Sequence, residues 1–517
     1  MSITDLTRRR LLQASAAAGA ASFVLPVTGH ASETVPRIRA NGDPQYMDPF
    51  NQIGGIEEYL KITCLVTLMR FSGSGTTAVE PYAAREIEWI SDRDVRFVLH
   101  EGIVWSGGYG TVSAEDVKYS FERIGDPEAG SPWQYTWSLL DHVEVVDELT
   151  GIIHLTEPFA PLFSSVLTQL GGHILCRKAM EDVGGTFTTE FPAQCGPYRM
   201  TEWQPEAKVV LERNPDWILP KPDFDGFEFI IVSDGKTAEL AYEAGELDYT
   251  LISVDSIARY QESLPENSAL FEAPSIDYSW LGMNTDHPKL ADIRVRKAIQ
   301  YAVDIQMILD GAYGGLAAPA TGIQAPGTVG YREQRQIAQR DVDMARSLLE
   351  EAGVSGLELT LTCLNDTVSQ SVCQIVQANL ADVGITVDIL VYDAGVYWNL
   401  GLESEGDDWK DLQLTLMPYS GGVDPSENLV WFLPDQVGVW NWERWNSPEF
   451  GALYDKAMVE LDPEARYAMY VEMQDLMEES GAYHFITHGV NAALHRDWME
   501  PSVRLSGSPQ LPQFRKV

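Results

Sequence analysis

The chain has 517 residues, 45% hydrophobic and 10% aromatic, and its 36 Lys and Arg against 76 Asp and Glu give a formal net charge of −40. Side chains of this kind can bury a core, so the composition excludes an intrinsically disordered chain, and at roughly 100–200 residues per domain the length predicts two or more domains. A field this negative repels phosphate backbones and anionic lipids, which excludes nucleic acid and acidic membranes as partners.

The first 31 residues have the pattern of an export signal. Three arginines, Arg8 to Arg10, precede a weakly apolar run rich in Ala and Gly, and Gly29-His30-Ala31 has the small residues that a signal peptidase requires. The Thr-Arg-Arg-x-Leu-Leu order resembles a twin-arginine signal. We therefore expect cleavage near Ala31 and a periplasmic mature chain. No later stretch reaches the roughly 18 apolar residues of a membrane span, so no membrane insertion is expected.

Short β-like runs dominate the first half of the chain, and tight connections between several of them favour antiparallel pairing. They lie at residues 95–100, 143–146, 152–155, 208–212 and 227–232. One helix is predicted among them, over residues 113–123, because Ser113 can cap it and Asp116 lies in its first turn.

The second half alternates helices and strands. One helix is predicted over residues 292–310. Farther along, Asp341 can cap a helix that ends at Gly353, and a strand from 357, a helix from about 367 and a strand from 385 follow it. This βαβ unit predicts a parallel sheet flanked by helices.

Two more helices are predicted near the C-terminus. Ser447 precedes one of them, and Asp462 precedes the other, which has Pro463 at its first position.

Five cysteines would enter an oxidising compartment if the chain is exported: Cys64, Cys176, Cys195, Cys363 and Cys373. The odd number leaves at least one thiol free, and no C-x-x-C spacing encodes a redox site or a zinc ribbon. Cys176 with Cys195, or Cys363 with Cys373, could form a disulfide. Burial of all five as small hydrophobic side chains is at least as good an interpretation.

The sequence contains no standard catalytic motif. A His-Glu-x-x-His zinc motif, a Gly-x-Ser-x-Gly nucleophile elbow and an EF-hand loop are all absent. His484 and His488 have i, i+4 spacing, but they lie in an alternating segment, where a period of two places them on one face of a strand. We therefore expect no catalytic residue, no metal site and no cofactor.

Tryptophan is concentrated in one stretch of the chain. Six of the 14 Trp residues lie between Trp398 and Trp445, around a turn at 419–425 that reads Tyr-Ser-Gly-Gly-Val-Asp-Pro. Glycines let a ligand approach the backbone, and aromatic walls offer large contact areas. Any one of these Trp residues is equally well explained as a core residue, but together they predict a binding cleft.

Five pairs of short motifs follow one another through nearly the whole mature chain. They are Arg39-Ala-Asn-Gly-Asp-Pro-Gln-Tyr-Met with Asp48-Pro49; Glu101-Gly-Ile-Val-Trp105 with Ser113-Ala-Glu-Asp-Val117; Cys195-Gly-Pro-Tyr198 with Glu212-Arg-Asn-Pro215; Leu281-Gly-Met-Asn284 with Asp292-Ile-Arg-Val-Arg296; and Ala345-Arg-Ser-Leu-Leu349 with Ala352-Gly353. In this order they resemble the extracytoplasmic solute-binding proteins of the ABC-transporter peptide/nickel/opine class (solute-binding protein family 5), which include dipeptide- and oligopeptide-binding proteins.

The resemblance implies an α/β, two-lobed periplasmic-binding-protein fold of the class II type, with an extra subdomain in lobe I, mixed sheets flanked by helices, and a ligand cleft between the lobes. Lobe I would comprise residues 32–272 and 486–517, and lobe II residues 273–485, with crossings near 272–282 and 483–494. The implied function is capture of a small solute by a monomer that delivers it to the permease subunits of an ABC importer, without chemistry.

The turn also bears on the ligand. In the dipeptide- and oligopeptide-binding relatives an Asp of this turn pairs with the peptide α-ammonium, and Gly421 stands at that position, while Asp424 matches a different one. A buried charge-assisted hydrogen bond is worth about 1.5–3 kcal/mol, so its loss argues against a standard dipeptide. A peptide or peptide-like solute is still the favoured ligand class. An oligosaccharide, an opine or a cationic amine held by cation–π contacts is the alternative, and an exported enzyme is the least favoured.

The candidate ligand-binding residues are Tyr46, Tyr278, Trp398, Tyr419, Gly421, Gly422, Asp424, Trp431, Trp440 and Trp442.

Overall fold

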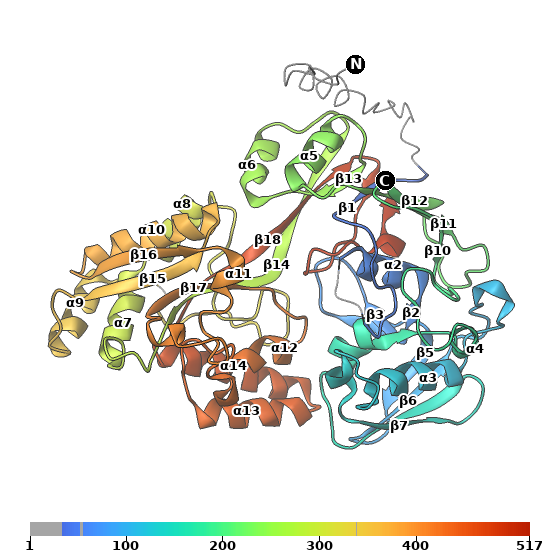
Figure 1. Cartoon of the computed structure of the whole chain (residues 1–517), viewed down its shortest axis with the longest axis horizontal. Helices are drawn as coiled ribbons and strands as arrows, with labels where there is room; N and C mark the ends of the chain where they lie inside the picture. The colour runs from blue at the N-terminus through green and yellow to red at the C-terminus, as the bar shows by residue number, and fades with distance from the viewer. Residues whose placement is uncertain (1–33, 52–54, 338) are drawn as a thin grey trace, which may run out of the picture.

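The computed structural model describes residues 34–51, 55–337 and 339–517, and the signal expected at residues 1–31 lies outside them. Two lobes stand side by side in the molecule (Figure 1). Two long strands, β14 (Ser268–Met283) and β18 (Tyr483–Arg496), pair antiparallel and run from one lobe to the other. We call the lobe that contains β1 lobe I and the lobe that contains β15 lobe II. Within the described ranges, no helix is both long and apolar enough to span a membrane.

One ten-stranded sheet passes through both lobes, with β18 and β14 adjacent near its centre. On the side of lobe I its order is β10 (Tyr198–Gln204), β11 (Lys208–Arg213), β12 (Gly226–Ile231), β1 (Arg37–Ala40) and β13 (Tyr249–Leu251). Beyond β14, in lobe II, follow β17 (Leu414–Tyr419), β15 (Glu358–Leu364) and β16 (Thr386–Tyr392). Parallel and antiparallel pairs both occur, so the sheet is mixed, as expected.

Lobe I contains an additional subdomain built on a four-stranded antiparallel sheet. Its strands, in spatial order, are β5 (Ala84–Trp89), β6 (Asp94–Leu99), β8 (Thr150–Leu155) and β7 (Leu140–Val145). The helix α3 (Ala114–Gly125) packs on it and begins at the predicted cap Ser113, which forms a capping box with Asp116. The core between them includes Phe121 and Trp137, whose ring centroids lie 4.4 Å apart. The predicted β-like runs are therefore confirmed.

The remaining elements complete the two lobes. Lobe I has the short strand pairs β2 (Val66–Thr67) with β9 (His173–Ile174), β3 (Met69–Phe71) with β4 (Val79–Pro81), and β19 (Met499–Glu500) with β20 (Arg515–Lys516), and the helices α2 (Ile56–Cys64), α4 (Arg177–Asp182), α5 (Gly235–Glu243) and α6 (Val254–Glu262). Lobe II has the helices α7 (Ile293–Ala302), α8 (Ile305–Ala312), α9 (Val342–Glu351), α10 (Thr367–Ala381), α11 (Ala394–Tyr397), α12 (Pro425–Leu429), α13 (Pro448–Val459) and α14 (Pro463–Glu479).

The βαβ unit of lobe II is confirmed. Asp341 caps α9, with its Oδ1 accepting the Met344 N–H at 2.9 Å, and Gly353 follows the helix at φ +69°. In the sequence β15 precedes α10 and β16 follows it. The two strands pair in parallel, with Leu361 opposite Ile389. Local capping chemistry therefore predicts this part of the fold.

The helix predicted over residues 292–310 is two helices, so that prediction was wrong. Val303 is extended, with ψ at 128°, and Asp304 caps the second helix by accepting the Met307 N–H at 3.0 Å. The apolar periodicity continues across this break, which hides it in the sequence. The side chain of Asp304, which caps α8, therefore marks the boundary between the two helices.

The five cysteines are buried, free thiols. The disulfide considered between Cys176 and Cys195 is therefore not formed, and both side chains pack in the core of the lobe I subdomain. Cys363 and Cys373, the other pair considered, are also free thiols and pack in the core of lobe II. Burial raises the pKa of Cys176 and Cys195, so both stay protonated and behave as small hydrophobic residues.

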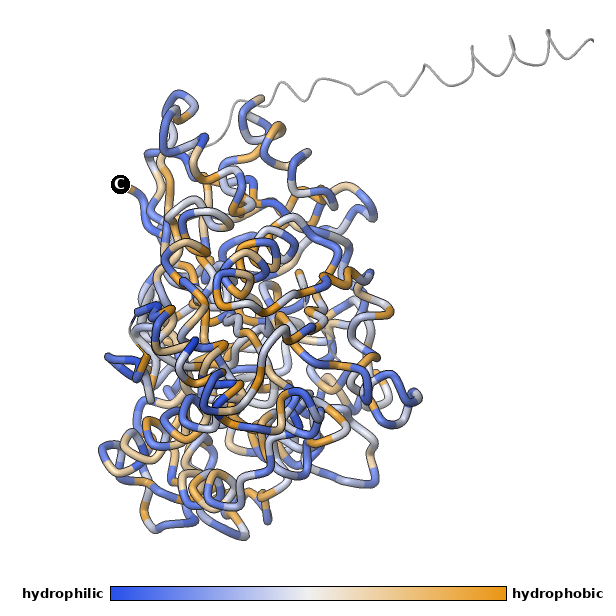
Figure 2. The backbone as a smooth tube through the Cα atoms, turned by 90° about the vertical axis from the view of Figure 1, so that its left-hand side faces the viewer, coloured by the Kyte–Doolittle hydropathy of each residue, from blue (hydrophilic) through white to orange (hydrophobic). Residues whose placement is uncertain are grey.

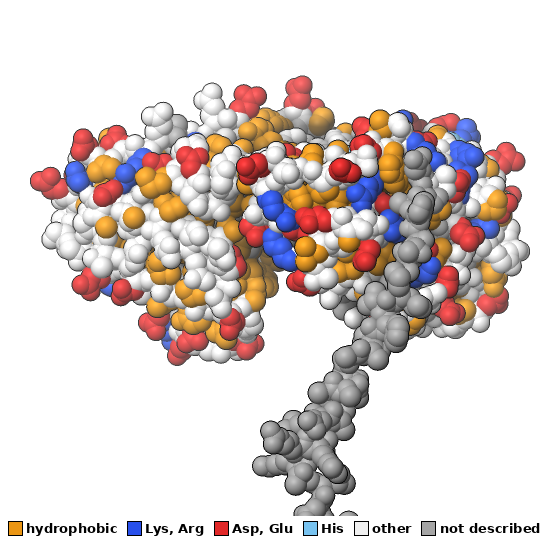
Figure 3. Space-filling model, turned by 90° about the horizontal axis from the view of Figure 1, so that it is seen from above, with side chains coloured by type: hydrophobic (Ala, Val, Ile, Leu, Met, Phe, Trp, Pro, Cys, Tyr) orange, Lys and Arg blue, Asp and Glu red, His pale blue; other side chains and the backbone are white. Residues whose placement is uncertain are grey.

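The hydropathy of the chain follows this architecture. Hydrophobic segments run through the interior, and hydrophilic segments form the outer loops (Figure 2). Seen from above, acidic side chains are scattered over the surface, and an indentation separates the two lobes (Figure 3). On this face the negative charge belongs to the solvated surface.

Candidate functional site

Six of the ten candidate residues form one aromatic cluster in lobe II. They are Tyr278, Trp398, Tyr419, Trp431, Trp440 and Trp442. Tyr419 is at the centre, with its ring centroid 6.1 Å from Tyr278, 6.0 Å from Trp398 and 6.3 Å from Trp440. Trp431 continues the cluster, 6.2 Å beyond Trp440. The six aromatic candidates are thus joined in one continuous set of ring contacts.

Strand pairing places the centre of this cluster. Tyr278 on β14 lies opposite Tyr419 on β17, and the alternation of β14 puts Trp280 on the same face as Tyr278. Trp280 is fully buried and meets Tyr419 edge to face at 4.9 Å. Tyr278 and Trp442 are 3% exposed and belong to the core, whereas Trp398, Tyr419, Trp431 and Trp440 are partly exposed. These four rings have the larger solvent-exposed surface within the cluster.

The buried carboxyl group of Glu443 is hydrogen-bonded to a tryptophan that packs against the cluster. Glu443 Oε1 accepts the Trp280 Nε1–H at 2.7 Å, and among the described residues Glu443 Oε2 has no hydrogen-bond partner. Burial raises the pKa of Glu443 to about 7. Gly282 makes room for it, since a Cβ at 282 would lie 2.0 Å from Glu443 Oε1. Sequence analysis missed Glu443, because nothing in its local pattern distinguishes it from a surface glutamate.

The glycines of the turn are required by close packing. A Cβ on Gly421 would lie 1.9 Å from the carbonyl oxygen of Ile276, and one on Gly422 would lie 2.3 Å from the Cβ of Glu427. The Gly422 N–H donates to Asn428 Oδ1 at 2.5 Å. The turn therefore lies directly on β14, and position 421 has no space for a carboxylate side chain.

Asp424 is a structural residue, which corrects its assignment as a ligand contact. It is 1% exposed, caps α12, and forms a two-pronged ion pair with Arg466 at 2.8 and 3.0 Å. It also accepts hydrogen bonds from the backbone and hydroxyl of Ser426 and from the Ser164 hydroxyl. Burial alone would raise the pKa of Asp424, but the Arg466 guanidinium and these hydrogen bonds lower it. Its oxygens are fully engaged and face the protein.

The Asp424 contact with Ser164 joins the two lobes. Ser164 and Ser165 belong to a short π-helical turn of lobe I (Leu162–Val166), and their hydroxyls donate to Asp424 Oδ2 at 2.7 Å and Glu427 Oε1 at 2.9 Å. Close by, the Ala160 N–H donates to the Met458 carbonyl at 2.8 Å. We call these three hydrogen bonds the interlobe contact. They connect α12 and α13 with the lobe I subdomain, away from the crossing strands (Figure 1).

Tyr46 lies apart from the aromatic cluster. It is 43% exposed in the loop after β1, where its N–H lies 3.5 Å from Glu57 Oε1. Because Tyr46 lies in lobe I, its role as a ligand contact on the lobe I side of the cleft stays a prediction.

A cavity of about 240 Å³ lies beside the cluster, at the crossing strands. Its lining residues are Asp277, Tyr278, Ser279, Tyr313, Pro418, Tyr419, Ser420, Thr487 and Gly489. It shares Tyr278 and Tyr419 with the aromatic cluster, and Asp277 is its one carboxylate. We call it the hinge pocket.

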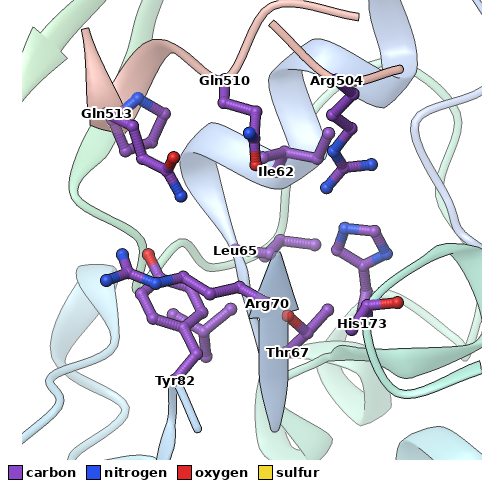
Figure 4. Close-up of a pocket in the computed structure, with 12 residues that line it drawn as sticks. Ile62, Leu65, Thr67, Arg70, Tyr82, His173, Arg504, Gln510 and Gln513 are labelled. Carbon is purple, nitrogen blue, oxygen red and sulfur yellow. The ribbon is translucent and has the colours of Figure 1, made fainter. Parts of the chain in front are cut away.

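Lobe I has a much smaller cavity, of about 20 Å³, where α2 and β2 meet the C-terminal segment (Figure 4). Arg504 and His173 approach it from one side, and Arg70 lies on the other (Figure 4). Both arginines are paired, Arg504 with Glu58 at 3.1 Å and Arg70 with Glu80 at 2.8 Å. Its volume suits a single water molecule, so it is too small for a solute. Across the described part of the chain, no group of three His, Cys, Asp or Glu could hold a metal ion.

The fold is the two-lobed α/β fold of binding proteins. Residues 78–439 match the family described as bacterial extracellular solute-binding proteins, family 5 Middle, and the chain belongs to this family. Its relatives include the glutathione-binding protein GsiB of Salmonella paratyphi A, 27% identical over 73% of this chain and 74% of that protein. GsiB of Escherichia coli O157:H7 is 25% identical over 75% and 76%.

Solved structures share the fold. HbpA2 from Haemophilus parasuis has a TM-score of 0.82 at 20% identity, covering 93% of this chain and 99% of that one. DppA from Helicobacter pylori in complex with the peptide STSA has a TM-score of 0.71 at 22% identity, covering 93% and 98%. The chain is therefore a substrate-binding component of the ABC-importer type, and its relatives are binding proteins rather than enzymes.

Proposed function

We propose that the chain is exported through a twin-arginine signal cleaved near Ala31 and serves in the periplasm as a monomeric, non-catalytic receptor. It captures a peptide or peptide-like solute between its lobes and delivers it to the membrane subunits of an ABC permease. The signal pattern and the family support export, and the two-lobed fold supports capture by closure.

The lobe boundaries form part of this proposal. We assign residues 32–272 and 486–517 to lobe I and residues 273–485 to lobe II. The crossing strands β14 and β18 support this division, because each contributes to the sheet on both sides.

The partly exposed aromatic rings at the end of β17 carry the assignment of the binding site. Trp398, Tyr419 and Trp440 present partly exposed rings beside the turn at 419–425. Glutathione is the first compound to test, since the GsiB relatives are named for binding it. An oligosaccharide is the second candidate, because rings of this kind also stack on sugars. Opines and cationic amines complete the set of solutes.

The test is a screen of the chain purified after export against four solute classes: short peptides including glutathione, oligosaccharides, opines and amines. A solute that binds only the native state raises the melting temperature, and calorimetric titration then gives its affinity. We expect one class to bind, and we expect Trp440→Ala to weaken its binding by roughly 10-fold.

Trp409→Ala is the matched control, because Trp409 lies in the same stretch but packs against Arg444, 4.0 Å from its ring centroid. We expect it to leave affinity unchanged. The proposal fails if no class of solute stabilises the chain. The site assignment fails if Trp440→Ala and Trp409→Ala bind the solute with the same affinity.

A further inference from the structure

The small cavity of lobe I, here called the lobe I cavity, has cations in its lining. Arg70 and Arg504 line it together with the buried His173, whereas no Asp or Glu of the described residues does. Figure 4 shows Arg504 and His173 at one side of this space and Arg70 at the other. The chain as a whole has about twice as many acidic as basic residues, 76 against 36. A lining with basic side chains alone therefore separates this cavity from the acidic character of the chain.

One N–H group of Arg504 has no partner. The residue is 8% exposed, and its Nη1 donates to Glu58 Oε1 at 3.1 Å, while Glu58 Oε2 accepts the Ser508 hydroxyl at 3.2 Å. Among the described residues, Arg504 Nε has no hydrogen-bond partner. Burial lowers the pKa of Arg504, although Glu58 opposes the shift, so the positive charge is incompletely compensated. A buried cation with an unused donor favours a bound acceptor.

Most other polar groups of the lining are engaged with the protein. Gln510 and Gln513 donate their amide N–H groups to backbone carbonyls at 3.1 and 3.0 Å, and the hydroxyls of Thr67 and Thr168 donate to other carbonyls at 2.5 and 2.7 Å. These bonds fix the walls of the cavity. The guanidinium groups are then the groups that can donate to a bound species.

We infer that the lobe I cavity binds one monatomic anion, chloride under ordinary conditions, between Arg504 and Arg70. Guanidinium groups bind anions through both their charge and their N–H donors. A volume of about 20 Å³ holds one small species and excludes oxyanions such as phosphate, which have several heavy atoms. A single water molecule also fits and accepts the free N–H, but it leaves the positive charge uncompensated.

The anion joins two parts of lobe I that are far apart in the sequence. Arg504 belongs to the segment that follows β18, and Arg70 belongs to β3. A neighbouring cavity of about 180 Å³ shares Arg70, Tyr82 and Pro512 with the lobe I cavity, which gives the anion a route to solvent. Because the site exists only in the folded chain, anion binding raises the stability of that state.

The test measures the melting temperature of the chain purified after export, without any solute. Sodium chloride replaces sodium gluconate stepwise at constant ionic strength, so that screening of the negative surface stays the same. We expect the melting temperature to rise with chloride and then to level off, and bromide to act in the same way. Crystals soaked in bromide should show an anomalous scattering peak beside Arg504.

Two variants and a control identify the residues. Arg70→Gln removes a cation from a partly exposed position, and Arg504→Lys keeps the charge but removes the Nε–H donor. We expect each to weaken chloride binding about 10-fold. Arg85→Gln is the control, because it removes the same charge from the same lobe, and Arg85 is exposed and pairs with Glu86 at 3.1 Å outside the cavity.

The inference is wrong if chloride and gluconate give the same melting temperature, or if bromide does not occupy the cavity, which then holds water only. It is also wrong if Arg85→Gln weakens the chloride effect as much as Arg70→Gln does. The measurements use no solute, so their outcome is independent of the proposed function.

Discussion

Glu443 links the stability of the aromatic cluster to pH. Its pKa rises from the usual 4.5 to about 7 on folding, because the carboxyl group is buried with one oxygen unpaired. The folded state therefore holds the proton more tightly than the unfolded state does. The stabilising effect of the neutral carboxyl is complete below pH 4.5 and is lost as the pH rises to about 7, by up to roughly 3 kcal/mol.

We predict that Glu443→Gln removes this loss. Urea unfolding gives the free energy of unfolding of each protein at pH 5 and at pH 7. The change between the two pH values is then compared between the wild type and the variant. Lys61, whose buried amine has its pKa lowered to about 7, changes stability only above this range. Equal pH dependence in the two proteins would show that Glu443 does not titrate in the folded state.

The pair of Asp424 and Arg466 yields a second prediction at this scale. Arg466→Met leaves the carboxylate of Asp424 buried without its counter-ion, which typically costs about 3–5 kcal/mol of unfolding free energy. Adding Asp424→Asn should recover part of the loss, because the uncompensated charge is then gone. Denaturant unfolding of the three proteins measures both effects. If the double variant is no more stable than Arg466→Met, burial of the charge is not the cause.

At the scale of elements, the contact between the turn and β14 determines where β17 ends. Gly421→Ala places a Cβ against the Ile276 carbonyl and must displace the turn. We predict a lower melting temperature and weaker solute binding, since Tyr419 and Ser420 move with the turn. Gly395→Ala is the control, because nothing lies within 4 Å of a Cβ at that position in α11. Equal behaviour of the two variants would contradict the packing argument.

Sequence analysis predicted the elements whose limits depend on local chemistry. Asp341 and Gly353 delimit α9 through their own hydrogen bonding and backbone conformation. The residues next to them in the sequence are therefore enough to predict the limits of this helix. The break at Asp304 was missed, because the apolar periodicity is the same on both sides of it. Elements that depend on distant partners are not encoded in any short window.

The same distinction applies to the site. The aromatic cluster was predictable because its tryptophans lie close together in the sequence. The role of Asp424 depends on Ser164 and Arg466, which lie 260 and 42 residues away in the sequence. Only the folded chain reveals that this carboxylate is neutralised by a counter-ion.

At the scale of the whole molecule, the interlobe contact holds the lobes together at the side opposite the crossing strands. Replacing both Ser164 and Ser165 by Ala removes two of its hydrogen bonds. We predict a larger radius of gyration in solution scattering and a few-fold lower solute affinity, since the lobes then separate more easily. Ser371→Ala is the control, because its hydroxyl bonds only within α10. An unchanged radius would mean that the contact does not hold the lobes.

The continuous ten-stranded sheet has a thermodynamic consequence. Because β14 and β18 belong to the hydrogen-bonded ladder of both lobes, neither lobe can melt without depriving the other of strands at its edge. The lobes should therefore unfold as one cooperative unit, with a calorimetric enthalpy equal to the van't Hoff enthalpy. Two resolved heat-capacity peaks would show that they unfold separately. A receptor of this design has moving halves but a single folding transition.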